Sequence, residues 1–299
     1  MVGLPNTEDN RRLFRDLLLA TDGIEKYLSG VILHDETFRQ EALDGELFPQ
    51  KLVKKGVLPG IKVDKGTVDF NGFSGEVLTE GLDGLPWRLE NYASLGARFT
   101  KWRSVIRIDK SRGLPTLECI HVNAVNLARY ARMAQDAGLV PIIEPEVLLE
   151  GNHTLEESRQ VIEYVLSHVF YEVERLRADT QGLILKTSMV IDGADDGIDS
   201  IPTAVAQMTV EALKNSVPAS VPGVVFLSGG QPSETATRNL NAIAKLEPLP
   251  WEISFSFARA LQEPVLKVWK GKSDLIPAAR DEFVRVLKMN IEADQGKLK

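Results

Sequence analysis

One repeating unit dominates the 299-residue sequence: a short apolar run rich in β-branched residues, followed by a longer amphipathic stretch. Nearly continuous runs of Val, Ile and Leu are typical of strands buried on both faces of a parallel sheet. Successive runs start about 30 to 43 residues apart, which is the length of a strand–helix unit with insertions. We find seven runs, at residues 30–36, 60–66, 98–108, 139–147, 182–191, 223–230 and 252–261.

The stretches between the runs carry helical patterns. Residues 7–20 open with Thr7 and two acidic residues, which is typical of a helix N-terminus, and then place apolar residues at helical spacing. Residues 155–177 and 234–246 show the same spacing. The sequence therefore predicts alternating strands and helices.

This alternation constrains the fold class. No linker rich in Pro, Gly or Ser and no low-complexity tract divides the chain, so we expect one domain over residues 1–299. Seven strand–helix units predict an α/β fold of the (β/α)₈ (TIM) barrel type in which one unit is missing. An open, doubly wound sheet is the alternative, but no G-x-G-x-x-G motif follows the first run, which disfavours it.

Composition limits the possible partners and compartments. No window approaches twenty consecutive apolar residues, so no membrane-spanning helix is expected. The first residues form neither a signal-peptide core nor a transit pattern, and we expect a cytoplasmic protein, or a plastid one if a transit peptide has been removed. The net charge of −7, with no basic block, argues against nucleic acid as a partner. The single cysteine, Cys119, suits a reducing compartment.

Ionisable residues occur within several apolar runs, although the interior of a barrel is dry and packed. Residues two apart on a strand share a face, so the members of each close pair should point the same way. Buried charges are costly when unpaired, which makes so many of them hard to explain as stabilising devices. We predict that they form a polar site at the carboxyl-terminal mouth: Lys62 and Asp64, Lys101 and Arg103, Glu144 and Glu146, and Lys186.

Lys186 is the candidate nucleophile of this site. Apolar walls and neighbouring cations both disfavour its ammonium form and lower its pKa. The neutral amine adds to a ketone to form an imine that acts as an electron sink, and Glu144 and Glu146 can transfer the protons. Cations beside the carboxylates disfavour a metal site, so neither a metal nor another cofactor is expected. The histidines show no ligand spacing and are expected to be surface or packing residues: His34, His121, His153 and His168.

Two late segments have the features of a phosphate site. Residues 227–231, Leu-Ser-Gly-Gly-Gln, end one run and lead into a helix, where free backbone N–H groups can bind an anion. Residues 256–259 end the next run and add the guanidinium of Arg259. Barrels often bind phosphate after strands seven and eight, which these runs become if one strand is missing at the front. Tight turns are the alternative explanation for Gly229 and Gly230.

Eight segments match one known family in their order along the chain: NTEDNRR (6–12), GIKVDKG (60–66), GLDGL (81–85), KWR (101–103), VPIIEPEVLLEG (140–151), LILKTSM (183–189), FLSGGQ (226–231) and SFARALQ (256–262). Together they cover essentially the whole chain and resemble class I (Schiff-base) fructose-1,6-bisphosphate aldolases. The segment SFARALQ has Ala258 where animal aldolases carry glycine, and in this it resembles the plant and plastid branch of the family. The resemblance implies a metal-independent lyase that reversibly cleaves fructose 1,6-bisphosphate to dihydroxyacetone phosphate and glyceraldehyde 3-phosphate, in glycolysis, gluconeogenesis or the Calvin cycle.

The resemblance also implies roles for the catalytic residues. Lys186 would be the Schiff-base lysine, although Thr187 stands where the family has proline. Glu144 would be the principal acid and base, and Glu146 its partner in the hydrogen-bond network around the amine. Lys101 and Arg103 would polarise the substrate and balance charge.

The remaining positions are implied to bind the sugar-phosphate substrate. Arg103 would balance charge, and Lys62 and Asp64 would belong to the same polar layer. Arg11 matches an arginine assigned to substrate binding. The phosphate-binding set comprises Ser228, Gly229, Gly230, Ser256 and Arg259. The family resemblance further implies a homotetramer.

One departure from the family affects these expectations. In the family, a strand ending in A-x-D-E-S and a Lys-Arg pair precede the segment that matches residues 6–12, and this sequence does not contain them. We therefore expect a barrel without its first strand, with unpaired edges at 30–36 and 252–259. Two other functions stay open: a non-catalytic scaffold protein with the aldolase fold, and an imine-forming aldolase for another sugar bisphosphate, such as sedoheptulose bisphosphate.

Overall fold

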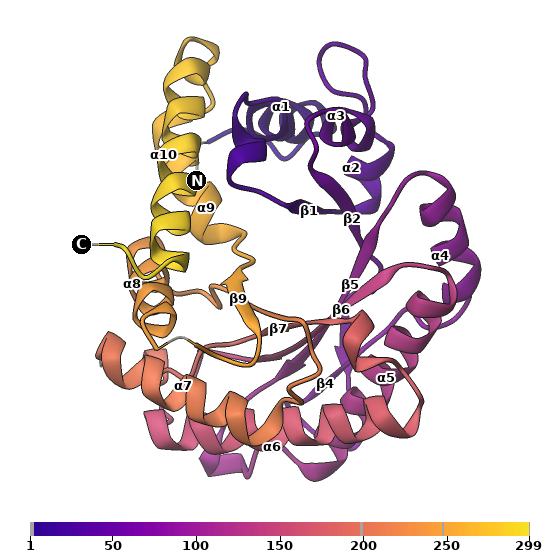
Figure 1. Ribbon diagram of the computed structural model, residues 1–299, viewed down its shortest axis with the longest axis vertical. Coiled ribbons are helices and arrows are strands. Elements are labelled where there is room, and N and C mark those ends of the chain that lie inside the picture. Colours follow the sequence, from indigo (N-terminus) through magenta and orange to yellow (C-terminus); the bar gives the residue numbers. More distant parts are fainter. Residues whose placement is uncertain (1–2, 198–199, 247, 299) are drawn as a thin grey trace.

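A computed structural model describes residues 3–197, 200–246 and 248–298. Within these ranges the protein has an α/β fold, in which a parallel sheet curls around the centre and helices lie outside it (Figure 1). The sheet has seven strands in this order: β1 (Gly30–Leu33), β2 (Leu58–Lys62), β5 (Phe99–Ile106), β6 (Val140–Val147), β7 (Ile184–Thr187), β8 (Gly223–Phe226) and β9 (Glu252–Phe255).

Six of the seven apolar runs contain one of these strands, and the run at 60–66 overlaps β2, which begins two residues earlier, so the predicted strands are confirmed. Neighbouring strands pair in parallel throughout the sheet. The strand order follows the chain without reversal, whereas a doubly wound sheet reverses its order at a switch point. The alternative of a doubly wound sheet was therefore wrong.

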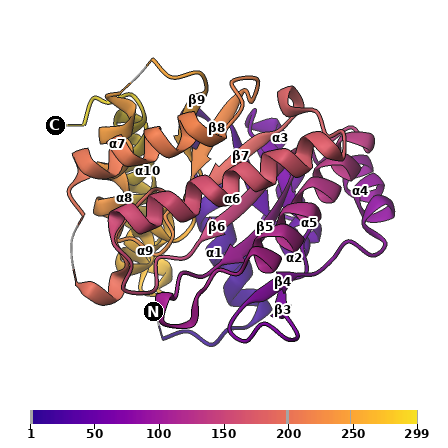
Figure 2. The same cartoon turned by 90° about the horizontal axis from the view of Figure 1, so that it is seen from below.

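Helices cover the outer side of the sheet, and Figure 2 shows α6 and α7 lying across the strands. The helices predicted at 7–20, 155–177 and 234–246 are confirmed as α1, α6 and α8. As expected, the side chain of Thr7 caps α1 by accepting a hydrogen bond from the Asn10 N–H. None of the described helices has both the length and the apolarity needed to cross a membrane. The bounds are α1 (Glu8–Leu19), α2 (Asp35–Arg39), α3 (Phe48–Lys54), α4 (Leu85–Ser94), α5 (Leu117–Asp136), α6 (Leu155–Arg175), α7 (Pro202–Ser216), α8 (Ser233–Ala244), α9 (Arg259–Trp269) and α10 (Ile276–Asp294).

A hairpin between β2 and α4 was not predicted. Its strands, β3 (Thr67–Asp69) and β4 (Val77–Thr79), pair antiparallel outside the main sheet. Thr79 Oγ1 donates a hydrogen bond of 2.8 Å to the carbonyl oxygen of Arg103. This bond attaches the hairpin to the carboxyl-terminal half of β5.

The sheet is open between its first and last strands. In the described part of the chain, β1 and β9 each pair with one neighbour only. A cavity of about 610 Å³ lies on the inner side of the sheet and is lined mainly by apolar side chains from all seven strands, among them Phe99, Ile184 and Val225. The observed architecture is thus a curled parallel sheet with two free edges.

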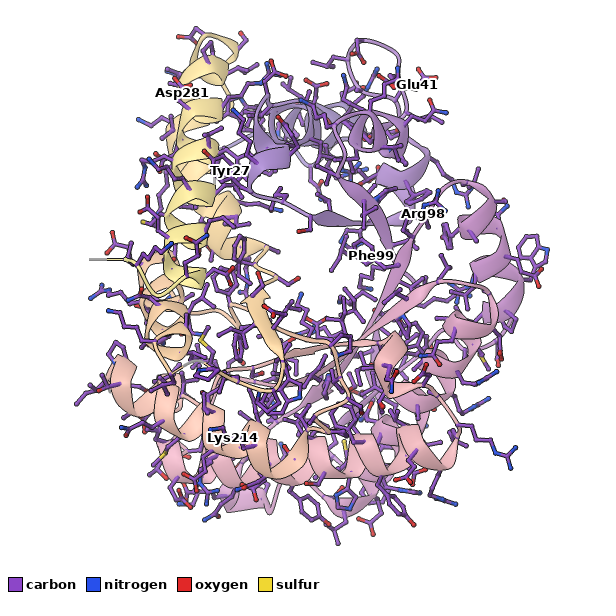
Figure 3. All side chains as sticks on the ribbon, in the orientation of Figure 1. Tyr27, Glu41, Arg98, Phe99, Lys214 and Asp281 are labelled. Carbon is purple, nitrogen blue, oxygen red and sulfur yellow. The ribbon has the colours of Figure 1, made fainter. Side chains whose placement is uncertain are left out.

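Phe99 at the start of β5 lies beside the central opening (Figure 3) and explains two glycines in the neighbouring strands. A Cβ atom at Gly60 would overlap the Phe99 ring, and one at Gly30 would lie 2.8 Å from it. Any larger residue at either position would displace the ring. These glycines therefore allow an aromatic side chain to pack close to the backbone of β1 and β2.

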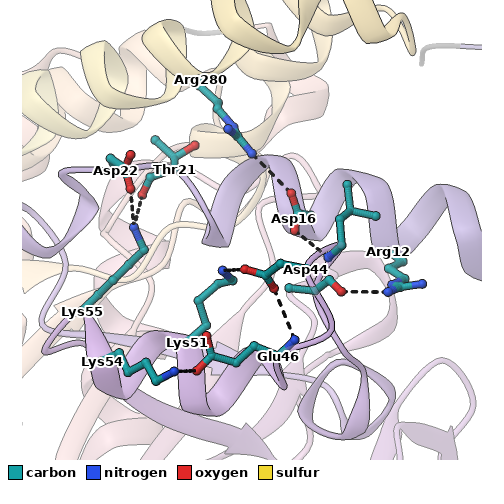
Figure 4. A network of polar contacts seen from close by, with 12 residues as sticks. Arg12, Asp16, Thr21, Asp22, Asp44, Glu46, Lys51, Lys54, Lys55 and Arg280 are labelled. Atoms are coloured by element: carbon teal, nitrogen blue, oxygen red, sulfur yellow. Dashed lines mark hydrogen bonds and ion pairs between the residues drawn. The ribbon is translucent and has the colours of Figure 1, made fainter.

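The outer layer connects the two ends of the chain across the open side. Asp16 of α1 is buried, and its carboxylate accepts hydrogen bonds from the Leu43 N–H at 3.0 Å and from Arg280 of α10 at 3.3 Å (Figure 4). Lys51 and Asp44 form a further ion pair of 2.6 Å nearby. Asp16 thus holds the first helix against the last although 264 residues separate it from Arg280.

Candidate active site

Strand alternation directs the predicted site residues away from the helices. On β5, Trp102 is fully buried and stacks on Tyr130 of α5, with 5.5 Å between ring centroids. Lys101 and Arg103, on either side of it, must point to the inner side of the sheet. Their partners come from the neighbouring strands, where the register sets Arg103 opposite Glu144.

Glu144 lies between two buried ammonium groups. Its Oε2 is 2.5 Å from Nζ of Lys101, and its Oε1 is 3.0 Å from Nζ of Lys186. The three side chains come from β5, β6 and β7 and are each at least nine-tenths buried. The structure therefore brings together three of the residues that the sequence placed in one site.

The electrostatic surroundings lower the pKa of Lys186. Burial disfavours its charged form most strongly, and repulsion from Lys101 adds to this, which together outweigh the attraction of Glu144. Burial by itself would raise the pKa of Glu144, but the ammonium groups of Lys186 and Lys101 hold it below its usual range. The site thus combines a lysine that loses its proton readily with a carboxylate that stays ionised.

A second group of charges lies beside this core. Arg103 forms an ion pair with Glu146, and its backbone N–H donates a hydrogen bond of 3.3 Å to Asp64. Lys62 pairs with the same Asp64 carboxylate and also donates to the Asp64 carbonyl oxygen at 3.2 Å. Asp64 therefore links the end of β2 to β5.

A cavity of about 280 Å³ opens onto Lys186. Lys62 and Lys101 also line it, and Ser256 borders it just beyond the end of β9. His34, expected from the sequence to be a surface or packing residue, lines the same cavity. Its position directly after β1 was the signal that could have identified it, since other site residues also lie at or near strand ends.

The glycine-containing loop after β8 lies next to Arg259 at the start of α9. A Cβ atom at Gly230 would be 3.5 Å from a guanidinium nitrogen of Arg259, so the loop after β8 approaches the start of α9. Gly229 and Gly230 have φ angles of +59° and +99°, which favour glycine. The Leu227 N–H donates to the Thr187 carbonyl oxygen at 3.0 Å. Ser228, which follows Leu227, is buried in a loop that continues from the strand beside that of Lys186.

Arg11 is engaged elsewhere. It lies on α1 and forms an ion pair of 2.5 Å with Glu36, whose other oxygen pairs with Arg15 at 2.5 Å. Hydrogen bonds from Arg11 and Arg15 lower the pKa of Glu36 to about 2. Arg11 is not among the residues that line the cavity around Lys186.

A buried lysine of lowered pKa beside an ionised carboxylate is typical of enzymes that form an imine with a carbonyl substrate. Its position on the inner side of a curled parallel sheet is typical of barrel enzymes. Comparison with known proteins identifies the particular family: the profile described as "Fructose-bisphosphate aldolase class-I" matches residues 1–299. The chain belongs to the class-I fructose-bisphosphate aldolases.

Similar proteins cover nearly the whole chain. Cytosolic fructose-bisphosphate aldolase 4 of Arabidopsis thaliana is 46% identical, over 99% of this chain and 75% of its own length. Fructose-bisphosphate aldolase of Dictyostelium discoideum is 45% identical, over 99% of this chain and 83% of its own length. In a solved structure, Plasmodium falciparum aldolase in complex with TRAP and a small-molecule inhibitor matches with a TM-score of 0.98 and 43% identity, covering 100% of this chain and 86% of that one.

Family membership confirms the predicted activity and the resemblance to plant aldolases. The protein is a lyase that acts on the sugar phosphate fructose 1,6-bisphosphate through the metal-independent, Schiff-base mechanism of class I.

Proposed function

We propose that Lys186 is the Schiff-base lysine and that Glu144 is the principal acid and base of this aldolase. The observation that carries the proposal is the contact of Glu144 with both Lys186 and Lys101, from neighbouring strands. Glu144 can exchange protons with the amine because they lie within hydrogen-bond distance. Lys101 keeps Glu144 ionised and favours the neutral form of Lys186.

The proposed reaction starts when the neutral amine of Lys186 adds to the C2 ketone of fructose 1,6-bisphosphate. Glu144 has taken up the proton that the Lys186 ammonium lost. One amine proton moves from nitrogen to oxygen, Glu144 passes its proton to the resulting hydroxyl, water leaves and an iminium forms. Glu144, again ionised, then accepts the proton of the C4 hydroxyl as the C3–C4 bond breaks. The bond electrons move into the iminium to give an enamine, and glyceraldehyde 3-phosphate departs. Protonation at C3 and addition of water release dihydroxyacetone phosphate and regenerate the amine.

The surrounding residues position this chemistry. Arg103 and Glu146 form an ion pair beside the reacting groups, and Lys62 and Asp64 extend it toward the cavity. We assign one phosphate to the loops that follow β8 and β9, because the guanidinium of Arg259 and the Gly230 backbone lie next to each other. We propose that Arg11 also binds substrate, which requires its ion pair with Glu36 to rearrange. The phosphate group of residues is Ser228, Gly229, Gly230, Ser256 and Arg259.

Borohydride trapping tests the assignment of Lys186. With dihydroxyacetone phosphate as ligand, reduction should leave a covalent adduct on Lys186, since only an imine is reduced in this way. Lys186→Arg should abolish both adduct and cleavage, whereas Lys214→Arg, on the outside of α7 (Figure 3), should change neither. An adduct on another lysine would overturn the assignment. Absence of any adduct would instead favour the alternative of a non-catalytic scaffold.

We also propose that residues 1–299 form one domain and that an eighth strand completes a TIM barrel between β9 and β1. The free edges of these two strands support this, since an unpaired edge otherwise exposes backbone N–H and C=O groups. An experimental structure with a strand of this protein or of a neighbouring subunit in that position would agree with the proposal. One with a closed pairing of β9 and β1 would contradict it.

Assembly and location follow the family in our proposal. We infer a homotetramer, which sedimentation equilibrium tests through a mass four times that of the chain. We infer a cytoplasmic location, supported by the cytosolic relatives of Arabidopsis thaliana, and a plastid location would require a transit peptide. Fractionation of the source cells distinguishes the two locations.

We expect a preference for fructose 1,6-bisphosphate over sedoheptulose bisphosphate. Turnover of the two substrates in competition measures that preference.

A further inference from the structure

His34 occupies the position directly after β1, with φ −86° and ψ 159°. Its carbonyl oxygen accepts a hydrogen bond of 2.8 Å from the Phe38 N–H, which fixes the backbone at the start of α2. Its ring does not cap that helix, and among the described residues nothing hydrogen-bonds to either ring nitrogen. The ring therefore has both nitrogens available for a ligand.

The ring lines the same cavity as Lys62, Lys101 and Lys186. Its enclosure lowers the pKa of His34, and Lys62, Lys101 and Arg15 lower it further against the attraction of Asp64. These groups come from β2, β5, α1 and the segment after β2, and Lys186 of β7 lines the same cavity. A neutral imidazole in the empty site can both donate and accept a hydrogen bond.

The substrate of this family carries two phosphates, and Arg259 with the loops after β8 and β9 accounts for one of them in the proposed function. When C2 is bonded to Lys186, the other phosphate must lie in another part of the mouth. His34 and Lys62 stand at the ends of β1 and β2, on one side of the opening in the curled sheet, and Ser256 stands beyond the end of β9 on the other side of it. A cationic amine and an unpartnered imidazole in one cavity suit a phosphate dianion.

We propose that His34 determines specificity for bisphosphate substrates by hydrogen-bonding, beside Lys62, the phosphate that Arg259 does not hold. This inference rests on the proposed function, because it uses the position of Lys186 and the role of Arg259. The bound phosphate offsets the repulsion from Lys62 and Lys101, so the ring takes up a proton as the bisphosphate binds. His34 thus couples recognition of the second phosphate to proton uptake.

Binding of two reduced sugars tests the inference without catalysis. Hexitol 1,6-bisphosphate and hexitol 1-phosphate lack a ketone, so neither can form an imine, and calorimetry measures their binding to the full chain. His34→Phe keeps an aromatic ring but removes both nitrogens, and it should weaken bisphosphate binding about tenfold or more. Monophosphate binding should change less than about twofold, because the Arg259 side still holds its phosphate. His34→Gln should restore part of the bisphosphate affinity.

His168→Phe is the matched control. His168 lies on the outer helix α6, where its ring is 2.9 Å from the Tyr164 carbonyl oxygen, and its loss should leave both affinities unchanged. Equal weakening of both ligands by His34→Phe, or no weakening of either, would overturn the inference.

Proton uptake provides a second readout that a purely structural role would not change. Bisphosphate binding measured near pH 7 in buffers of different ionisation enthalpy should take up more protons in the unmodified protein than in His34→Phe. Equal uptake contradicts the proposal. The borohydride adduct on Lys186 should persist in His34→Phe, so failure of that adduct in the unmodified protein refutes the proposed function alone.

Discussion

Oε1 of Glu144 lies 3.0 Å from Nζ of Lys186, while Oε2 of the same carboxylate lies 2.5 Å from Nζ of Lys101. Glu144 therefore forms ion pairs with both lysines at once, one through each carboxylate oxygen. Lys101 affects Lys186 in two ways: it repels the second ammonium directly, and it draws the Glu144 charge toward itself. Both effects favour the neutral amine that imine formation requires.

This relationship predicts the effect of Lys101→Met on pH dependence. The pKa of Lys186 lies below its ordinary value, so the rate of adduct trapping should rise with pH through that lowered pKa and level off above it. Removing Lys101 leaves Glu144 to stabilise the Lys186 ammonium, which raises the pKa of Lys186. The rising limb of the trapping profile should therefore move to higher pH.

The midpoint of that limb is the quantity to measure, since the substitution also lowers the maximal rate. Lys214→Met on the exposed side of α7 serves as the control and should leave the midpoint unchanged. A shift to lower pH in Lys101→Met would show that Glu144 does not govern the protonation of Lys186.

Arg259→Ala tests the phosphate loops. The guanidinium lies beside Gly230, and a charge-assisted hydrogen bond to phosphate should be lost with it. We expect KM for fructose 1,6-bisphosphate to rise about tenfold or more, and KM for a non-phosphorylated ketose to change far less. Arg238→Ala on α8 is a matched control because that arginine is also exposed. Equal losses on both substrates would assign Arg259 a structural role.

Part of the site was predictable because strand alternation can be read directly from sequence. Lys101 and Arg103 flank Trp102, so once β5 is recognised their common direction follows. The contacts between strands were not predictable in this way. Whether Lys101 meets Glu144 or Glu146 depends on strand register and side-chain reach, which the spacing within one strand does not contain.

His34 and the β3–β4 hairpin were missed for physical reasons. His34 lies just beyond a strand of only four residues, and its place in the cavity depends on β2 and β5, whose Lys62 and Lys101 line the same cavity. The strands of the hairpin have three residues each, and those of β3 are all exposed, so no apolar alternation marks them. Tertiary contacts, such as that between Thr79 and Arg103, stabilise such short elements.

The contact between the first and last helices predicts a loss of stability in Asp16→Ala. The buried Asp16 carboxylate accepts from the Leu43 N–H and from Arg280, and its removal leaves the Leu43 N–H without this acceptor. We expect the free energy of unfolding to fall by about 1–3 kcal/mol, the cost of a buried polar group that loses its partner.

Asp22→Ala is the control. It removes a fully exposed partner of Lys55 and should cause no measurable change, because surface ion pairs contribute little. Urea denaturation of both variants measures the difference. Asp16→Asn separates the two contacts, because its amide oxygen can still accept a hydrogen bond from the Leu43 N–H but carries no charge to attract Arg280. If Asp16→Ala unfolds at the same urea concentration as the unmodified protein, then the packing of α1 against α10 holds the two ends together without this carboxylate.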